Sequence, residues 1–344
     1  MKPFRSIMYS KAFNLCAIFG LLSLFISSCK EEKVHEQAEI TFYHWKQDFS
    51  LDSNELAILS DNKVTELYVR FFDVTLQDGN CVPISVIDFN KATISYDVIP
   101  CIYIENRVFE GYSSDLDNKI FELVSEIAEL NNLTISEIQF DCDWTSSTNS
   151  NYFQFLENFQ EISPWTVSST IRLHQYKYPE MTGIPPVDKA VLMCYNMDDI
   201  YDLETTNSII SNNTLLSYVS NTPVYPLELD LALPAYHWGL VYRLDDLALI
   251  VNDIETESIV DYPFTKLSST KFRADSSFYF NQTYFNRGDI LRIENSSREV
   301  LLDCAHTLKG SNQTYNKVIF YHLNSKYLSS YDESIFKEIA DIIH

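Results

Sequence analysis

The chain has few positive charges. Its 344 residues include 25 Lys and Arg against 48 Asp and Glu, which gives a formal net charge of −23. Nucleic acid and anionic membrane surfaces attract basic proteins, so this composition argues against both as partners. An acidic surface fits a neutral or cationic ligand, although most of these carboxylates simply keep the surface solvated.

The cysteines and histidines do not have the spacing of a metal site. Beyond Cys29 the chain has five cysteines, an odd number, and three of them lie in apolar runs where small buried residues are expected. His174, His237 and His322 are scattered, so we expect them to line a polar site and not to hold a metal ion. The sequence contains no internal repeat and predicts neither a cofactor nor a disulfide framework.

The first 28 residues have the three regions of a secretory signal. Lys2, Arg5 and Lys11 come without an acidic residue, an apolar run covers 12–26, and small residues lead to Cys29. The run is too short and too asymmetrically flanked for a resident transmembrane helix. The residues before Cys29 resemble a bacterial lipobox, which implies a lipid anchor on that cysteine. The alternative is an ordinary cleaved signal with an incidental Cys.

The residues after Cys29 point to the cell surface. Lys30-Glu31-Glu32 is similar to the export signal of surface lipoproteins in Bacteroidetes-type bacteria, which implies an outer-membrane protein exposed on the cell surface. The polar segment 29–39 is expected to be a flexible tether. Loss of the signal leaves 22 Lys and Arg and a formal charge of −26, so we expect contact with the membrane through the lipid anchor only.

The remaining chain, 40–344, alternates between strand-like and helix-like segments. The clearest helical pattern is at 115–130, where Ile120, Val124 and Ile127 recur at helical spacing behind Ser114, a candidate N-cap. Eight strands alternating with helices predict an α/β fold, a (β/α)8 TIM barrel. The eight apolar runs are Ile40–Trp45, Val64–Phe71, Val98–Ile104, Ile138–Asp143, Thr166–Leu173, Ala190–Tyr195, Leu227–Leu233 and Val318–His322.

The spacing changes between the seventh and eighth runs, which are about 85 residues apart. Short alternating stretches and a turn-forming segment in this interval predict a small β-rich subdomain inserted at 245–312. These stretches are Ser277–Phe280, Ile290–Glu294 and Val300–Asp303, and the turn is Asn286-Arg287-Gly288-Asp289.

Polar and aromatic residues follow the predicted strand ends, where β/α barrels place their active sites. Asp141 and Asp143 lie on one face of the fourth strand, and two carboxylates there are costly without a function. The alternative is a charge pair satisfied by backbone or Arg. With Glu105 they are the candidate catalytic residues. The candidate binding residues are Trp45, Asp73, Trp144, Tyr195, Asn196, Tyr236 and Trp238.

The tryptophans among these candidates suggest a carbohydrate ligand. A pyranose ring has an apolar C–H face that packs against an indole, while its hydroxyls form hydrogen bonds at the rim. The alternative is that these residues are core or capping aromatics. The expected partner is therefore an oligo- or polysaccharide.

Three segments resemble glycoside hydrolase family 18, the chitinase-like barrels. The segment Asp141-Cys142-Asp143-Trp144-Thr145 is similar to the end of the signature Asp-x-x-Asp-x-Asp-x-Glu, with Ile138 in place of the first Asp and Thr145 in place of the catalytic Glu. Met193 and Tyr195 match a Met-x-Tyr-Asp strand in which Asn196 replaces the Asp. Leu233-Pro234-Ala235-Tyr236 is similar to a Gly-x-Pro-x-Tyr-Gly run without its glycines.

The resemblance implies roles for individual residues. Asp143 would orient an acetamido group, Tyr195 would hydrogen-bond it, and Trp45, Trp144 or Trp238 would form a stacking floor. Thr145 cannot deliver the proton that glycosidic cleavage needs.

Three possibilities stay open for the chemistry. Asp143 could itself be the acid, with Glu105, Asp73 or Asp198 as its partner, the site could bind without cleaving, or the alignment could be shifted. The expected function is a surface-anchored lipoprotein that binds or hydrolyses glycans. The alternative is a non-catalytic glycan-binding or structural lipoprotein.

Overall fold

The computed structural model describes residues 38–90, 92–112, 115–332 and 334–344. The expected signal peptide, Cys29, most of the tether at 29–39 and the Ser114 cap lie outside these residues. Within the described segments, no helix has both the length and the apolar character needed to cross a bilayer.

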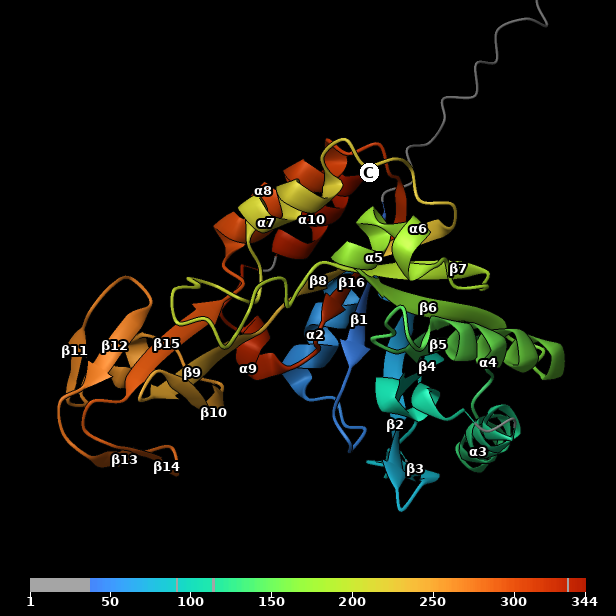
Figure 1. Cartoon of the computed structure of the whole chain (residues 1–344), viewed down its shortest axis with the longest axis horizontal. Helices are drawn as coiled ribbons and strands as arrows, with labels where there is room; N and C mark the ends of the chain where they lie inside the picture. Colours follow the sequence, from blue (N-terminus) through green and yellow to red (C-terminus); the bar gives the residue numbers. More distant parts are fainter. Residues whose placement is uncertain (1–37, 91, 113–114, 333) are drawn as a thin grey trace, which may run out of the picture. The chain divides into compact units, whose positions relative to one another are not determined.

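Eight parallel strands form a closed barrel (Figure 1). The ring closes because β1 pairs with both β2 and β16. Each of the eight predicted apolar runs overlaps one of these strands, so the predicted (β/α)8 barrel is confirmed. The strands are β1 (Glu39–His44), β2 (Glu66–Gln77), β4 (Asp97–Ile104), β5 (Glu137–Asp141), β6 (Thr166–Arg172), β7 (Lys189–Met193), β8 (Glu228–Pro234) and β16 (Tyr315–Tyr321).

Helices follow most of these strands and bury their apolar stripes against the barrel. In α3, Ile120, Val124 and Ile127 are buried as their spacing predicts. Between β2 and β4, the described residues contain an antiparallel strand, β3 (Asn80–Ile84), and no helix. The helices are α2 (Ser53–Asp61), η1 (Asn106–Glu110), α3 (Leu116–Leu130), α4 (Asn149–Ile162), α5 (Leu173–Lys177), α6 (Pro179–Thr182), α7 (Asn212–Val219), η2 (Glu257–Ile259), α8 (Arg298–Lys309), α9 (Ser325–Leu328) and α10 (Ile335–Ile343).

The insertion after β8 has its own antiparallel sheet, in the order β10, β9, β15, β12, β11, together with a separate hairpin of β13 and β14 (Figure 1). It also has its own apolar core, which includes Val241, Phe272 and Leu291. The strands are β9 (His237–Arg243), β10 (Asp246–Asn252), β11 (Phe264–Lys266), β12 (Lys271–Ala274), β13 (Phe278–Phe280), β14 (Thr283–Phe285) and β15 (Ile290–Asn295).

The inserted strands differ from the expected interval of 245–312 at both ends. They begin at His237, directly after β8. Val300–Asp303 is not a strand but part of α8, because Leu301, Cys304 and Leu308 repeat with helical spacing and pack into the barrel's core.

The barrel interior is filled by alternate residues of each strand. A middle layer includes Tyr43, Cys101 and Gln139, and the Tyr43 hydroxyl donates to Gln139 Oε1 at 2.8 Å. Toward the N-terminal ends of the strands, Lys189 Nζ lies 2.8 Å from Glu137 Oε2 and 3.0 Å from Asp230 Oδ2. The described interior is therefore packed, and β/α barrels place their active sites at the C-terminal mouth.

Candidate functional site

The mouth is built on a row of neighbouring residues at the C-terminal ends of the strands. Asp73 of β2 pairs in register with Tyr103 of β4, and Tyr103 pairs with Asp141 of β5. Thr170 of β6 continues the row, since its hydroxyl donates to Asp141 Oδ1 at 2.7 Å. The structure thus brings Asp73 and Asp141 to the same rim, although they are far apart in the sequence.

Asp141 has an environment that favours its protonated form. Burial, followed by the nearby charge of Asp143, raises the pKa of Asp141 to about 6, against the opposing effects of Thr170 and Arg172. The carboxyl therefore changes its charge close to neutral pH. Such a group can donate a hydrogen bond to a sugar below pH 6 and accept one above it.

Asp143 is held by an arginine. Arg172 at the end of β6 donates from Nη2 to Asp143 Oδ2 at 2.7 Å and from Nε to the other oxygen, which is a bidentate pair. The sequence analysis missed Arg172 because the fifth predicted run ended at Leu173, one residue later. Period-2 alternation from Thr170 places Arg172 on the inner face, so the residue pattern could have identified it.

Two other mouth carboxylates are also paired with arginines. Arg70 Nε donates to Asp73 Oδ1 at 2.7 Å. Glu105 accepts from the Thr75 hydroxyl at 2.7 Å and from Arg107. Although burial opposes ionisation, these two donors lower the pKa of Glu105. Glu105 is therefore poorly suited to supply a proton.

An aromatic cluster lies beside the carboxylates. Tyr195 stacks on Tyr321 with ring centroids 5.1 Å apart. Trp45 and Tyr236 meet Tyr321 edge-on, at 5.6 and 5.8 Å. Three of the four are predicted site residues. Tyr321 was missed because the eighth predicted run was taken to end at His322, the following residue.

Asn196 and Trp238 extend this cluster. Asn196 has a left-handed backbone with a φ of 51°, and its Oδ1 accepts from the Tyr236 hydroxyl at 2.6 Å. Trp238 of β9 meets Tyr236 edge-on at 5.5 Å, and its Nε1 donates to Glu294 Oε2 at 2.8 Å. Trp238 as a whole is half-buried.

Trp144 does not belong to the site, which corrects the expectation from the sequence. Its indole is buried, stacks on Tyr152 of α4 at 5.3 Å, and donates to the Thr182 carbonyl at 3.0 Å. The alternation that turns Asp143 inward turns Trp144 outward against the helices. A buried indole has no free face for a sugar.

Thr145 and Asp198 make their side-chain contacts with other residues than those of the carboxylate row. Thr145 is exposed ahead of α4, with its hydroxyl 2.8 Å from that of Ser147. Asp198 accepts from Thr214 of α7 at 2.9 Å. In the described part of the chain, no group of three or more His, Cys, Asp or Glu is placed to hold a metal ion.

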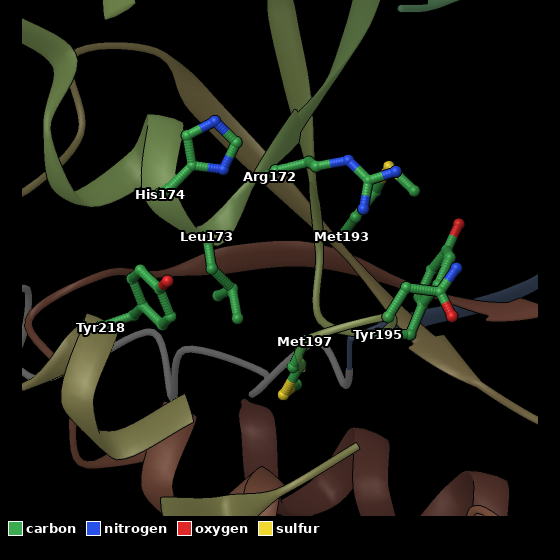
Figure 2. A pocket seen from close by; sticks show the side chains of 8 residues that line it. Arg172, Leu173, His174, Met193, Tyr195, Met197 and Tyr218 are labelled. Carbon is green, nitrogen blue, oxygen red and sulfur yellow. The ribbon is translucent and has the colours of Figure 1, made fainter. Parts of the chain in front are cut away.

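A pocket adjoins the Arg172–Asp143 pair. Figure 2 shows that Arg172 extends toward Met193 and Tyr195, while His174 and Tyr218 lie on the opposite side. The pocket connects the ion pair to the aromatic cluster and is the candidate binding pocket. Its lining residues are Arg172, Leu173, His174, Met193, Tyr195, Asn196, Met197 and Tyr218.

The chain matches no protein-family model and no curated protein. Its structure is similar to the Bacillus cereus spore cortex-lytic enzyme SleL, with a TM-score of 0.56 and 14% identity over 89% of this chain and 74% of that chain. It is also similar to the chitinase of Chromobacterium violaceum, with a TM-score of 0.54 and 12% identity over 89% of this chain and 98% of that chain.

A third similar structure contains a bound sugar. It is a mutant of Ostrinia furnacalis Group II chitinase catalytic domain 2 in complex with penta-N-acetylchitooctaose, with a TM-score of 0.51 and 10% identity over 90% of this chain and 97% of that chain. The chain shares the fold of these chitinases. This is the fold that the resemblance to glycoside hydrolase family 18 implies. At such low identity the likeness establishes the fold and not the activity.

Proposed function

We propose that the protein binds a neutral glycan at the mouth of the barrel and does not hydrolyse it. The observation that carries this proposal is the pairing of the mouth carboxylates. Asp73, Glu105 and Asp143 each form an ion pair with an arginine. Asp141 instead accepts a hydrogen bond from Thr170.

Hydrolysis of a glycosidic bond needs a proton donor and a second carboxylate that acts as base or nucleophile. Asp141 has the raised pKa of a donor. Both oxygens of its neighbour Asp143 accept from Arg172, so this bidentate ion pair competes with attack on a sugar and with activation of water. Thr145 offers only a hydroxyl where the resemblance places the acid.

Binding of a neutral sugar needs no free carboxylate. Arginine–carboxylate pairs present N–H donors and oxygen lone pairs without a large net charge, which suits hydroxyl groups. The half-buried Trp45 and Tyr321 supply aromatic surface for the C–H faces of sugar rings, while Tyr195 and Tyr236, 6% and 7% exposed, pack against Tyr321 and support it. The chitinase-like fold and the oligosaccharide in a similar structure support this class of ligand.

The test is a titration of the soluble domain with neutral oligosaccharides such as chitotetraose and cellotetraose, with reducing ends measured in parallel. We expect binding without release of product. Tyr195→Phe removes one hydroxyl from the pocket and should weaken binding several-fold, whereas Tyr201→Phe, at an exposed position, should not. Release of reducing ends that Asp141→Asn abolishes would identify a hydrolase instead.

Position 145 gives a second test of the same proposal. The wild-type protein should release no product from chitin-type oligosaccharides, and Thr145→Glu should restore a trace, because general-acid catalysis commonly supplies about 10²–10⁴-fold. Adding Asp143→Ala should remove that trace. Efficient cleavage by the wild-type protein that is insensitive to Asp143→Ala would show that both the alignment and the site are wrong.

We also propose that the protein is a lipoprotein of the bacterial outer membrane, anchored through Cys29 and exposed on the cell surface, with 29–39 as its tether. The support is the order of charged, apolar and small residues before Cys29. Cys29→Ala should leave an unprocessed or soluble form. Metabolic labelling that still finds acyl chains on this variant would contradict the proposal.

A further inference from the structure

We propose that the β13–β14 hairpin of the insertion is a second glycan-binding site, which holds a neutral polysaccharide chain on the rings of Tyr279 and Tyr284. Neither tyrosine belongs to the proposed site at the mouth of the barrel. The proposal extends the proposed function, because it assumes the same class of ligand at a separate place.

The two tyrosines form one exposed face of the hairpin. Tyr279 pairs with Tyr284 in register, and Phe278 pairs with Phe285, so strand alternation turns the two pairs to opposite sides. Phe285 is buried, whereas Tyr279 is 70% exposed and Tyr284 is 44% exposed. The centroids of the two tyrosine rings are 4.9 Å apart and their planes are tilted by 52°, so the two rings lie next to each other on this face.

The other face anchors the hairpin. Phe278 stacks on Phe285 at 5.4 Å, and Phe264 meets both rings edge-on, at 5.1 and 5.3 Å. Phe280 meets Tyr262 edge-on at 4.8 Å. Because this packing fixes the backbone under Tyr279 and Tyr284, a ligand would pay little ordering entropy to bind there.

The hairpin has no charged residue, which favours an uncharged ligand. Residues 278–286 contain no Asp, Glu, Lys or Arg, in a chain in which 21% of residues are charged. Asn281 and Gln282 at the turn are exposed amides that can bond to hydroxyls. Aromatic faces with neutral polar groups match a sugar ring, whereas an anionic polymer would be repelled by the chain's net charge of −23.

Fold stability alone does not call for exposed tyrosines at these positions. Cross-strand threonines or valines would also support the hairpin, with far less exposed aromatic surface. A second site would instead strengthen binding to long chains, because attachment at one site raises the effective concentration at the other. Short oligosaccharides that fill only the mouth would not benefit.

The experiment compares full-length wild type with the double variant Tyr279→Thr/Tyr284→Thr, which keeps strand propensity. Tyr201→Thr is the matched control, because Tyr201 is also 70% exposed but lies in the loop after β7. Retention on insoluble chitin and cellulose is measured beside titration with chitotetraose. We expect the double variant to lose several-fold or more of its retention on at least one polymer, with chitotetraose binding unchanged and the control like wild type.

Equal retention of wild type and double variant on both polymers, with equal thermal unfolding, would overturn this second site. If the threonine double variant loses retention because it unfolds, its melting temperature will be lower than that of wild type. In that case Tyr279→Phe/Tyr284→Phe is used instead, and this variant should keep both the fold and most of the retention. Wild type that binds neither polymer would also overturn it. Retention on a polymer that depends on the hairpin, in a protein that does not bind chitotetraose, would refute the proposed site at the mouth and leave the hairpin site standing.

Discussion

The two ends of the barrel interior use charge pairs in different surroundings. At the N-terminal end, Lys189 lies between Glu137 and Asp230, and the Asp230 side chain is only 2% exposed. At the C-terminal end, the Arg172 and Asp143 side chains are 29% and 41% exposed. Removing one partner of a buried ion pair leaves an unpaired charge in the interior, which strongly destabilises the fold. A solvent-exposed pair contributes little to stability and can exchange hydrogen bonds with a ligand. Under the proposed function, the exposed Arg172–Asp143 pair therefore serves binding, whereas the Lys189 pairs serve the fold. The mouth pair of Arg70 and Asp73, 19% and 12% exposed, is closer in burial to the Lys189 pairs.

The tryptophans show the same contrast. Trp144 is enclosed between the barrel and α4, and Trp238 lies half-buried at the edge of the mouth. Both had been expected to bind sugar, because both follow a predicted strand end. Trp238 therefore stays a candidate for the proposed glycan site, whereas Trp144 is a core residue.

The largest expected effect is at Trp144. Trp144→Ala should lower the free energy of unfolding by about 3–5 kcal/mol, because it empties a packed site and removes the hydrogen bond to Thr182. Urea unfolding followed by circular dichroism measures this change. If Trp144→Ala is as stable as wild type but binds glycan more weakly, Trp144 is a binding residue after all and this prediction is wrong.

Lys189 tests the sealed end of the barrel. Lys189→Met should cost about 3 kcal/mol of unfolding free energy, since Glu137 and Asp230 would lose their shared cation. Lys326→Met is the control, because Lys326 pairs with Asp253 while 68% exposed and should cost less than about 1 kcal/mol. Similar losses of unfolding free energy in the two variants would contradict the distinction between buried and exposed ion pairs.

Asp141 gives a pH-dependent effect of intermediate size. Its folded pKa of about 6 lies above its ordinary value, so folding favours the protonated form, and stability falls as the pH rises from about 4 to about 6. Asp141→Asn should therefore stabilise the protein at pH 7.5 by about 1–2 kcal/mol, after allowance for partial exposure. Below about pH 4 the gain should vanish. Unfolding curves at both pH values test this, and a gain that is independent of pH would contradict it.

Trp238 should give the smallest change. Trp238→Ala should weaken oligosaccharide binding several-fold, since stacking contributes about 0.5–1.5 kcal/mol beyond buried area. Trp238→Phe keeps a ring but loses the bond to Glu294, so it should lie between wild type and Trp238→Ala. Unchanged affinity in a Trp238→Ala variant that melts like wild type would remove this residue from the site.

The sequence by itself determined the barrel. Strand and helix periodicity are local properties, set by neighbouring residues that share one face, so the runs at Ile40–Trp45 and Ala190–Tyr195 could be read without knowledge of their partners. The same alternation placed Asp141 and Asp143 on one inner face. It failed at Val300–Asp303, where a short apolar stretch fits a strand as well as a helix.

Only the tertiary structure decided which groups meet. Arg172 binds Asp143 because β5 and β6 are neighbours in a closed ring, and 29 residues separate the two in the chain. Tyr321 completes the aromatic cluster because β16 returns beside β1 after the whole insertion. Pairing of this kind depends on register and on ring closure, which no local pattern contains, and it determines whether a carboxylate at the mouth is free or already held.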